Sequence, residues 1–143
     1  MGNNISKASD NVFARTTFRM IKLGIKHSYK DHLAIEILYE DGSLARQLLL
    51  ANLSESDLTQ IAARISSLSK ARNHTETLSV EEFMCRYRAR LAEQTVDVKR
   101  LSSADILCDI LADYITATSQ ILELDGITRD SIKRQLDELR GEF

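Results

Sequence analysis

The chain has 143 residues, of which 43% are apolar and 28% are charged, and its formal net charge is −2. This composition is typical of a globular domain and excludes a disordered or collagen-like chain. No apolar run approaches the roughly 18 residues of a membrane span, and two cysteines are too few for a disulfide scaffold. The length predicts one domain and excludes a large multidomain enzyme.

Proline is absent and glycine is scarce, which favours long helices joined by short polar turns. We therefore expect a mainly α fold, a single-domain helical bundle of about five helices over residues 9–143. Residues 1–8 are polar and are expected to form a flexible N-terminus.

The first predicted helix starts near Ser9 or Asp10, both of which are common N-cap residues. On a helical wheel, a broad apolar face predicts contact with the core. Its members are Phe13, Thr17, Phe18, Met20, Ile21 and Ile25. The opposite side carries cations, so this helix is amphipathic.

Charge is distributed unevenly along the chain. Residues 1–30 contain six basic groups and one acid, whereas residues 101–143 contain four basic groups and nine acids. A basic first part and an acidic last part can neutralise each other within one fold or between the two copies of a dimer.

Residues 33–51 are the segment for which the sequence favours strands. Apolar residues alternate with smaller or charged ones from Leu33 to Tyr39, and an Asp-Gly pair follows at positions 41 and 42. Asp-Gly between two such runs is a strong hairpin signal, so we predict a β-hairpin packed on the helices. The competing interpretation is a helix, because Leu, Ala, Arg and Gln dominate residues 44–51.

Helix starts are clearer in the rest of the chain. Residues 54–57 and 79–82 resemble capping boxes. A helix predicted over residues 103–124 carries two apolar stripes, which indicates either a central position in the bundle or a face that meets another chain. We expect it to form the spine of the core. If Leu111 and Ile115 lie in the core, substitution of either by aspartate would unfold the chain. If they lie at an interface between chains, the same substitution would only dissociate the chains.

The sequence contains no motif that predicts catalysis, a metal site or a cofactor site. Phosphate-binding glycine loops, zinc-protease motifs and nucleophile elbows are absent. His27, His32 and His74 lack ligand spacing. Cys85 and Cys108 are expected to act as small hydrophobic residues in a reduced, cytoplasmic protein, although a disulfide between them stays open. We therefore expect a protein that is not an enzyme and that needs no metal or cofactor.

A set of cations is the site that we predict to bind a partner or phosphate groups. Its members are Arg15, Arg19, Lys22, Lys26, Lys30, Arg86 and Arg90. Cations along one helix edge can follow nucleic-acid phosphates, lie on an anionic membrane or contact an acidic protein. The other interpretation is a solvated or internally neutralised surface.

The first six residues, Met-Gly-Asn-Asn-Ile-Ser, match the N-myristoylation pattern, with Gly2 as the acylated residue. An acyl chain followed by a basic helix would supply the two signals that stable membrane attachment requires. Gly2 is therefore a candidate lipidation site.

Three functions follow, in order of weight. The first is a non-enzymatic regulatory protein, of the accessory or effector type, that binds a protein partner, with a homodimer as one form it can take. The second is a nucleic-acid-binding regulator that uses the basic N-terminal helix. The third is a myristoylated, membrane-associated effector or matrix-like protein.

Overall fold

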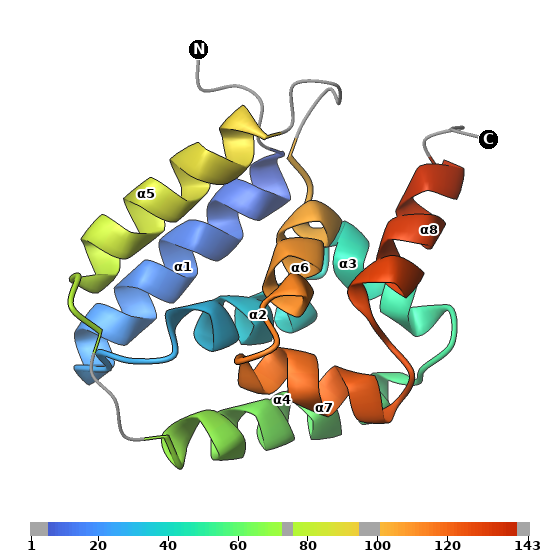
Figure 1. Cartoon of the computed structure of the whole chain (residues 1–143), viewed down its shortest axis with the longest axis horizontal. Coiled ribbons are helices and arrows are strands. Elements are labelled where there is room, and N and C mark those ends of the chain that lie inside the picture. Colours follow the sequence, from blue (N-terminus) through green and yellow to red (C-terminus); the bar gives the residue numbers. More distant parts are fainter. Residues whose placement is uncertain (1–5, 73–75, 95–100, 140–143) are drawn as a thin grey trace.

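The computed structural model describes residues 6–72, 76–94 and 101–139, which form eight helices and no β-strand. The helices (Figure 1) are α1 (Lys7–Leu23), α2 (Tyr29–Tyr39), α3 (Leu44–Leu50), α4 (Glu55–Lys70), α5 (Val80–Glu93), α6 (Ser103–Ala112), α7 (Ala117–Leu124) and α8 (Arg129–Leu139). The mainly α class predicted from the sequence is confirmed. The number of helices is larger than expected for two reasons. The segment predicted as a hairpin forms two helices, and the helix predicted over residues 103–124 is divided into two.

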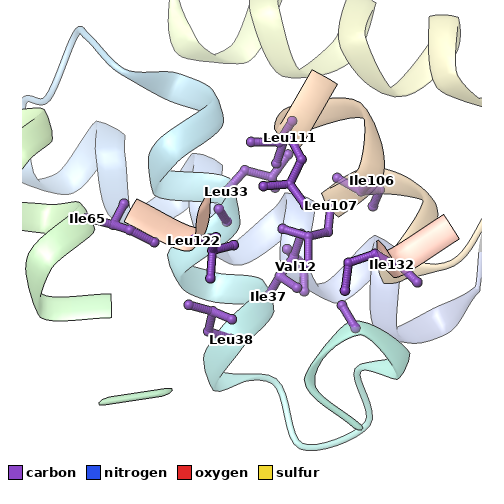
Figure 2. Packing of buried hydrophobic residues seen from close by; sticks show 14 of the residues in the cluster. Val12, Leu33, Ile37, Leu38, Ile65, Ile106, Leu107, Leu111, Leu122 and Ile132 are labelled. Atoms are coloured by element: carbon purple, nitrogen blue, oxygen red, sulfur yellow. The ribbon is translucent and has the colours of Figure 1, made fainter. Parts of the chain in front are cut away.

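Helix α2 lies at the centre and packs against α1, α3, α4, α5, α6 and α7. Leu33 and Ile37 of α2 lie in the middle of the core, between Ile65 of α4 and Leu107 of α6 (Figure 2). All four side chains are essentially inaccessible to solvent, and each such burial stabilises the fold by about 1.5–3 kcal/mol. Helix α2 is therefore central to the core, and residues 103–124, which we expected to form its spine, supply buried side chains from α6 and α7 beside it.

The predicted β-hairpin near residues 33–51 is wrong, because this segment forms α2 and α3 joined by a short turn. A type I′ hairpin turn needs positive φ at both central residues, and neither Asp41 nor Gly42 has it. The turn leads into Ser43, whose hydroxyl accepts a hydrogen bond from the Arg46 N–H and so begins α3.

The burial of α2 explains why its sequence pattern did not predict a helix. Seven of its eleven residues are buried, and they include Asp31 and Glu36 as well as apolar residues. A helix that is surrounded by other helices loses the one-sided apolar stripe on which sequence-based recognition depends.

The single helix predicted over residues 103–124 is also wrong, because a turn separates α6 from α7. The Asp113 carboxylate accepts a hydrogen bond from the Ile115 N–H at 3.2 Å. The Thr116 hydroxyl accepts one from the Ser119 N–H at 3.1 Å. These side chains compete with the backbone bonds of a continuous helix, so the chain stops and restarts.

A buried carboxylate holds the start of α7 against α2. Asp31 is 3% exposed and accepts hydrogen bonds from the Ala117 N–H at 3.2 Å and the Thr118 N–H at 2.9 Å. The Thr118 hydroxyl donates a third, at 2.8 Å. The first N–H groups of a helix have no partner within it and carry partial positive charge, so an anion there is stabilising.

The helix starts predicted from capping motifs agree with the structure more closely than the predicted lengths of the elements do. Ser54 and Ser102 each form a full capping box, at the starts of α4 and α6. Ser79 makes half of the expected box, because its hydroxyl accepts from the Glu82 N–H while the Glu82 carboxylate pairs with Arg86.

We predict that Asp31→Ala lowers the free energy of unfolding by about 3 kcal/mol, because it leaves buried donors without an acceptor. Asp41→Ala is the matched control, since Asp41 is exposed in the turn before α3, and it should change stability by less than about 0.5 kcal/mol. Urea unfolding followed by circular dichroism measures both. Equal effects of the two substitutions would contradict the anchoring role of Asp31.

Substitution by aspartate should unfold the chain at Leu111 but not at Ile115. Leu111 is 3% exposed and Ile115 is 75% exposed. Leu111→Asp buries a charge without a partner and should prevent folding, whereas Ile115→Asp should keep the helical circular dichroism spectrum and the unfolding midpoint. A folded Leu111→Asp variant would contradict the described packing of α6.

Candidate functional site

Helix α1 turns one side toward α2 and α5 and the other toward solvent. It begins at Lys7, after the N-cap Ser6, and ends at Leu23, before the C-cap Gly24, whose φ of +67° lies in the left-handed region. The start is earlier than the expected Ser9 or Asp10. Residues 1–5, which include Gly2 and most of the expected flexible N-terminus, lie outside the described residues.

Three large apolar side chains of α1 are exposed near its C-terminal end. Phe18 is 68%, Ile21 is 50% and Leu23 is 62% exposed. We expected Phe18 and Ile21 to face the core, and this expectation is wrong. Phe13 and Met20 fill the narrow inward face, so Phe18 and Ile21 remain on the outside, while Leu23 is exposed on another side of the helix end.

Two cations of the predicted site are paired with carboxylates of α2. Arg15 contacts Glu36 at 3.4 Å and also Glu40, and Arg19 contacts Glu36 at 3.3 Å. Glu36 is 4% exposed. Burial works against the charge of Arg15, but its hydrogen bonds and attraction to Glu40 and Glu36 outweigh burial and raise its pKa. These two arginines therefore neutralise buried and half-buried acids.

Two more cations belong to a network between α2, α5 and α6. Lys30 Nζ lies 3.2 Å from Asp113 Oδ2, and Arg90 lies 3.3 Å from Asp109 Oδ2. The Tyr87 hydroxyl donates to the same Asp109 oxygen at 2.6 Å. Burial, and then the hydrogen bond to Asp109, raise the pKa of Tyr87 far above its usual value. Tyr87 therefore stays a donor, and Lys30 and Arg90 serve the packing of the fold.

The three remaining cations of the predicted site, Arg86, Lys22 and Lys26, differ in whether they form an ion pair. Arg86 pairs with Glu82 at 2.9 Å along α5. Lys22 and Lys26 are exposed and, within the described residues, have no ion pair. Of the predicted site, these two lysines are the cations that the fold does not use.

The two lysines lie beside the exposed apolar side chains. Phe18, Ile21 and Lys22 are spaced by three and four positions and so share the outer side of α1. Lys26 follows the helix, and its carbonyl accepts a hydrogen bond from the Glu76 N–H at 3.0 Å. We define the α1 patch as Phe18, Ile21, Lys22 and Lys26.

A second surface is a groove of about 740 Å³ between α6, α7 and α8, closed at one side by the end of α5. Apolar groups line part of it: Leu91, Cys108, Leu111, Ile127 and Leu136. Five carboxylates also line it, against the two cations Arg129 and Lys133: Asp105, Asp109, Glu123, Asp130 and Asp137. We call this the acidic groove. The sequence signal for it was the excess of acids after residue 100, but their convergence from three helices was not foreseen.

The acids of the groove are not equally engaged. Asp105 caps α6 and Asp109 belongs to the Tyr87 network. Glu123 and Asp137 have no ion pair within the described residues, and Asp130, with its side chain 82% exposed, has Arg129 at 3.7 Å. Glu123, Asp130 and Asp137 therefore face the groove with charge that the fold does not neutralise closely.

The histidines and cysteines do not form a site in the part of the chain that is described. The rings of His27 and His32 are 6.2 Å apart, and the buried Nε2 of His32 has no hydrogen-bond partner there. His74 lies outside the described residues. Cys85 and Cys108 are free thiols; Cys85 is exposed, which contradicts its expected role as a small hydrophobic residue.

The described residues also lack a group of three or more His, Cys, Asp or Glu side chains that could hold a metal ion. None of the described helices is both long and apolar enough to cross a membrane. Comparisons of the chain with protein-family models, with curated proteins and with solved structures gave no match. The two surfaces must therefore be interpreted from their own chemistry.

His32 predicts a pH dependence of stability. Burial, and then the charge of His27, lower its pKa in the folded chain below the usual value of about 6.5. Below that pH the unfolded chain binds a proton that the folded chain does not, so the free energy of unfolding should fall from about pH 7 toward pH 5. Urea unfolding across this range should show a smaller fall for His32→Leu than for the wild type; an unchanged fall would contradict the assignment.

Proposed function

We propose that this chain is a non-enzymatic interaction protein that binds a protein partner through the α1 patch. Contiguous exposed apolar side chains with a charged rim are the usual mark of a protein-binding surface. Here Phe18 and Ile21, which lie one helical turn apart, are each at least half exposed, and Lys22 and Lys26 lie near them. The partner that fits is a protein with an apolar groove bordered by carboxylates.

The exposure of Phe18 is the observation that carries the proposal. Fully burying a phenylalanine is worth about 1.5–3 kcal/mol, and 68% of this one remains in water. A partner that covers Phe18 and Ile21 gains much of that free energy. The lysines add attraction to an acidic partner and a preferred orientation.

A nucleic-acid partner is the weaker alternative. Such a site needs several cations directed at phosphates, and Arg15, Arg19 and Lys30 instead contact carboxylates of this chain. The two remaining lysines stand beside apolar groups, for which a phosphate backbone offers no contact.

An anionic membrane is the second candidate function, because apolar and basic side chains side by side on a helix also suit a lipid interface. The candidate acylation at Gly2 belongs to this alternative. It predicts that the intact mass of the chain from eukaryotic cells includes an acyl group, and that the α1 patch binds anionic vesicles.

Two variants of the α1 patch separate these functions. Phe18→Gln with Ile21→Gln removes the apolar contact, and Lys22→Glu with Lys26→Glu reverses the charge. We expect either variant to lose a protein that the wild type retains in near-stoichiometric amount from nuclease-treated extract of its source cells. Leu124→Gln is the control: it changes a 77% exposed leucine of α7 and should retain the partner.

The outcomes that contradict the proposal are distinct. Binding to DNA or RNA that is lost with the lysine variant and kept with the Phe18 and Ile21 variant would establish the nucleic-acid function. Binding to phosphatidylserine vesicles that both variants lose, without a patch-dependent protein, would establish the membrane function. Retention of the same protein by both patch variants would remove the α1 patch as the binding surface.

A further inference from the structure

The acidic groove has the chemistry that the α1 patch requires of a partner. The α1 patch presents two exposed apolar side chains and two cations without ion pairs in the described chain. The acidic groove combines an apolar lining with five carboxylates against two cations. An amphipathic helix whose apolar residues are spaced by three and four positions is a common occupant of such a groove.

The two surfaces cannot meet within one copy of the chain. Helix α1 is held by α2 and α5, with Arg88 of α5 paired to Asp10 of α1 at 2.9 Å. The groove is lined by residues of α6, α7 and α8, and Figure 1 shows α8 on the opposite side of the molecule from α1. Any contact between the α1 patch and the acidic groove therefore joins two molecules.

We propose that the partner of the α1 patch is a second copy of this chain, and that the patch of one copy docks in the acidic groove of the next. This inference rests on the proposed function and names its partner. Phe18 and Ile21 lie against the apolar lining of the groove, and Lys22 and Lys26 approach its acids.

The charges that would pair between copies are those left without close partners within one copy. Lys22 and Lys26 have no ion pair in the described chain, and the same holds for Glu123 and Asp137. Opposite charges on two docking surfaces accelerate encounter and select the orientation. Basic groups are concentrated toward the start of the chain and acids toward its end. In this arrangement they attract each other between two copies.

The contact is heterologous, because the two surfaces are different and each copy carries both. Such contacts propagate from copy to copy and close into a ring or extend as a filament. They do not form the two-fold dimer in which the same surface meets itself.

A mixing experiment tests this arrangement. The patch variant is Phe18→Gln with Ile21→Gln, and the groove variant is Glu123→Lys with Asp137→Lys. All of these positions are half-buried or exposed, so both variants should keep the helical circular dichroism spectrum. Sedimentation velocity and light scattering give the masses of the wild type, of each variant and of their equimolar mixture.

We expect the wild type to exceed the 16.2 kDa of one chain increasingly with concentration, and less so at high salt, which screens the charges. Each variant alone should remain monomeric. Their mixture should form complexes of two copies and none larger, because it contains one intact patch and one intact groove per pair. Leu124→Gln should assemble like the wild type.

A charge exchange provides a second test that does not depend on the apolar residues. Lys22→Glu with Lys26→Glu should weaken assembly by more than about tenfold. A single chain that carries both this pair and the groove substitutions presents reversed lysines to reversed acids at every contact between copies, so it should recover association that neither double variant has alone. Absence of recovery would overturn the pairing of these charges.

The inference is overturned if the wild type stays at the mass of one chain at every concentration. It is also overturned if the patch variant or the groove variant still assembles alone. A monomeric wild type that still captures another protein through Phe18 and Ile21 would leave the proposed function standing. A monomer without patch-dependent capture would remove both.

Discussion

The hydrogen bonds from the start of α7 to Asp31 are the constraint on which the second half of the structure depends. Asp31 lies on the central helix α2, and its carboxylate binds the Ala117 and Thr118 N–H groups. A buried carboxylate needs such donors to offset its loss of hydration. By fixing where α7 begins, it separates α7 from α6 and sets the position of the helices that border the acidic groove.

Ion pairing within the fold decides which charges remain for a partner. Glu36 is buried and holds Arg15 and Arg19, and the carboxylates around Tyr87 hold Lys30 and Arg90. A stripe of cations on a helical wheel therefore overstates the free positive charge of the surface, because the wheel omits the acids that neighbouring helices bring to it. What remains is a short cationic segment beside exposed apolar side chains.

The α1 patch and the acidic groove share a physical origin. Each is a place where amphipathic helices of this small domain have more apolar or charged surface than their neighbours within the fold can cover. The rigid placement of α1 between α2 and α5 keeps the patch outside. The same rigidity favours association, since a preformed docking surface loses little conformational entropy on binding.

The sequence by itself determined the helical class, the capping box at Ser54 and the amphipathic character of α1, because these depend on residues a few positions apart. Tertiary structure alone decided that residues 33–51 form helices and that the helix over 103–124 is interrupted. It also decided that Phe18 faces solvent. The acceptor of the Ala117 N–H lies 86 positions away, at Asp31. A local pattern carries no information about such a partner, and it does not show how the acids of α6, α7 and α8, which lie on separate helices, converge.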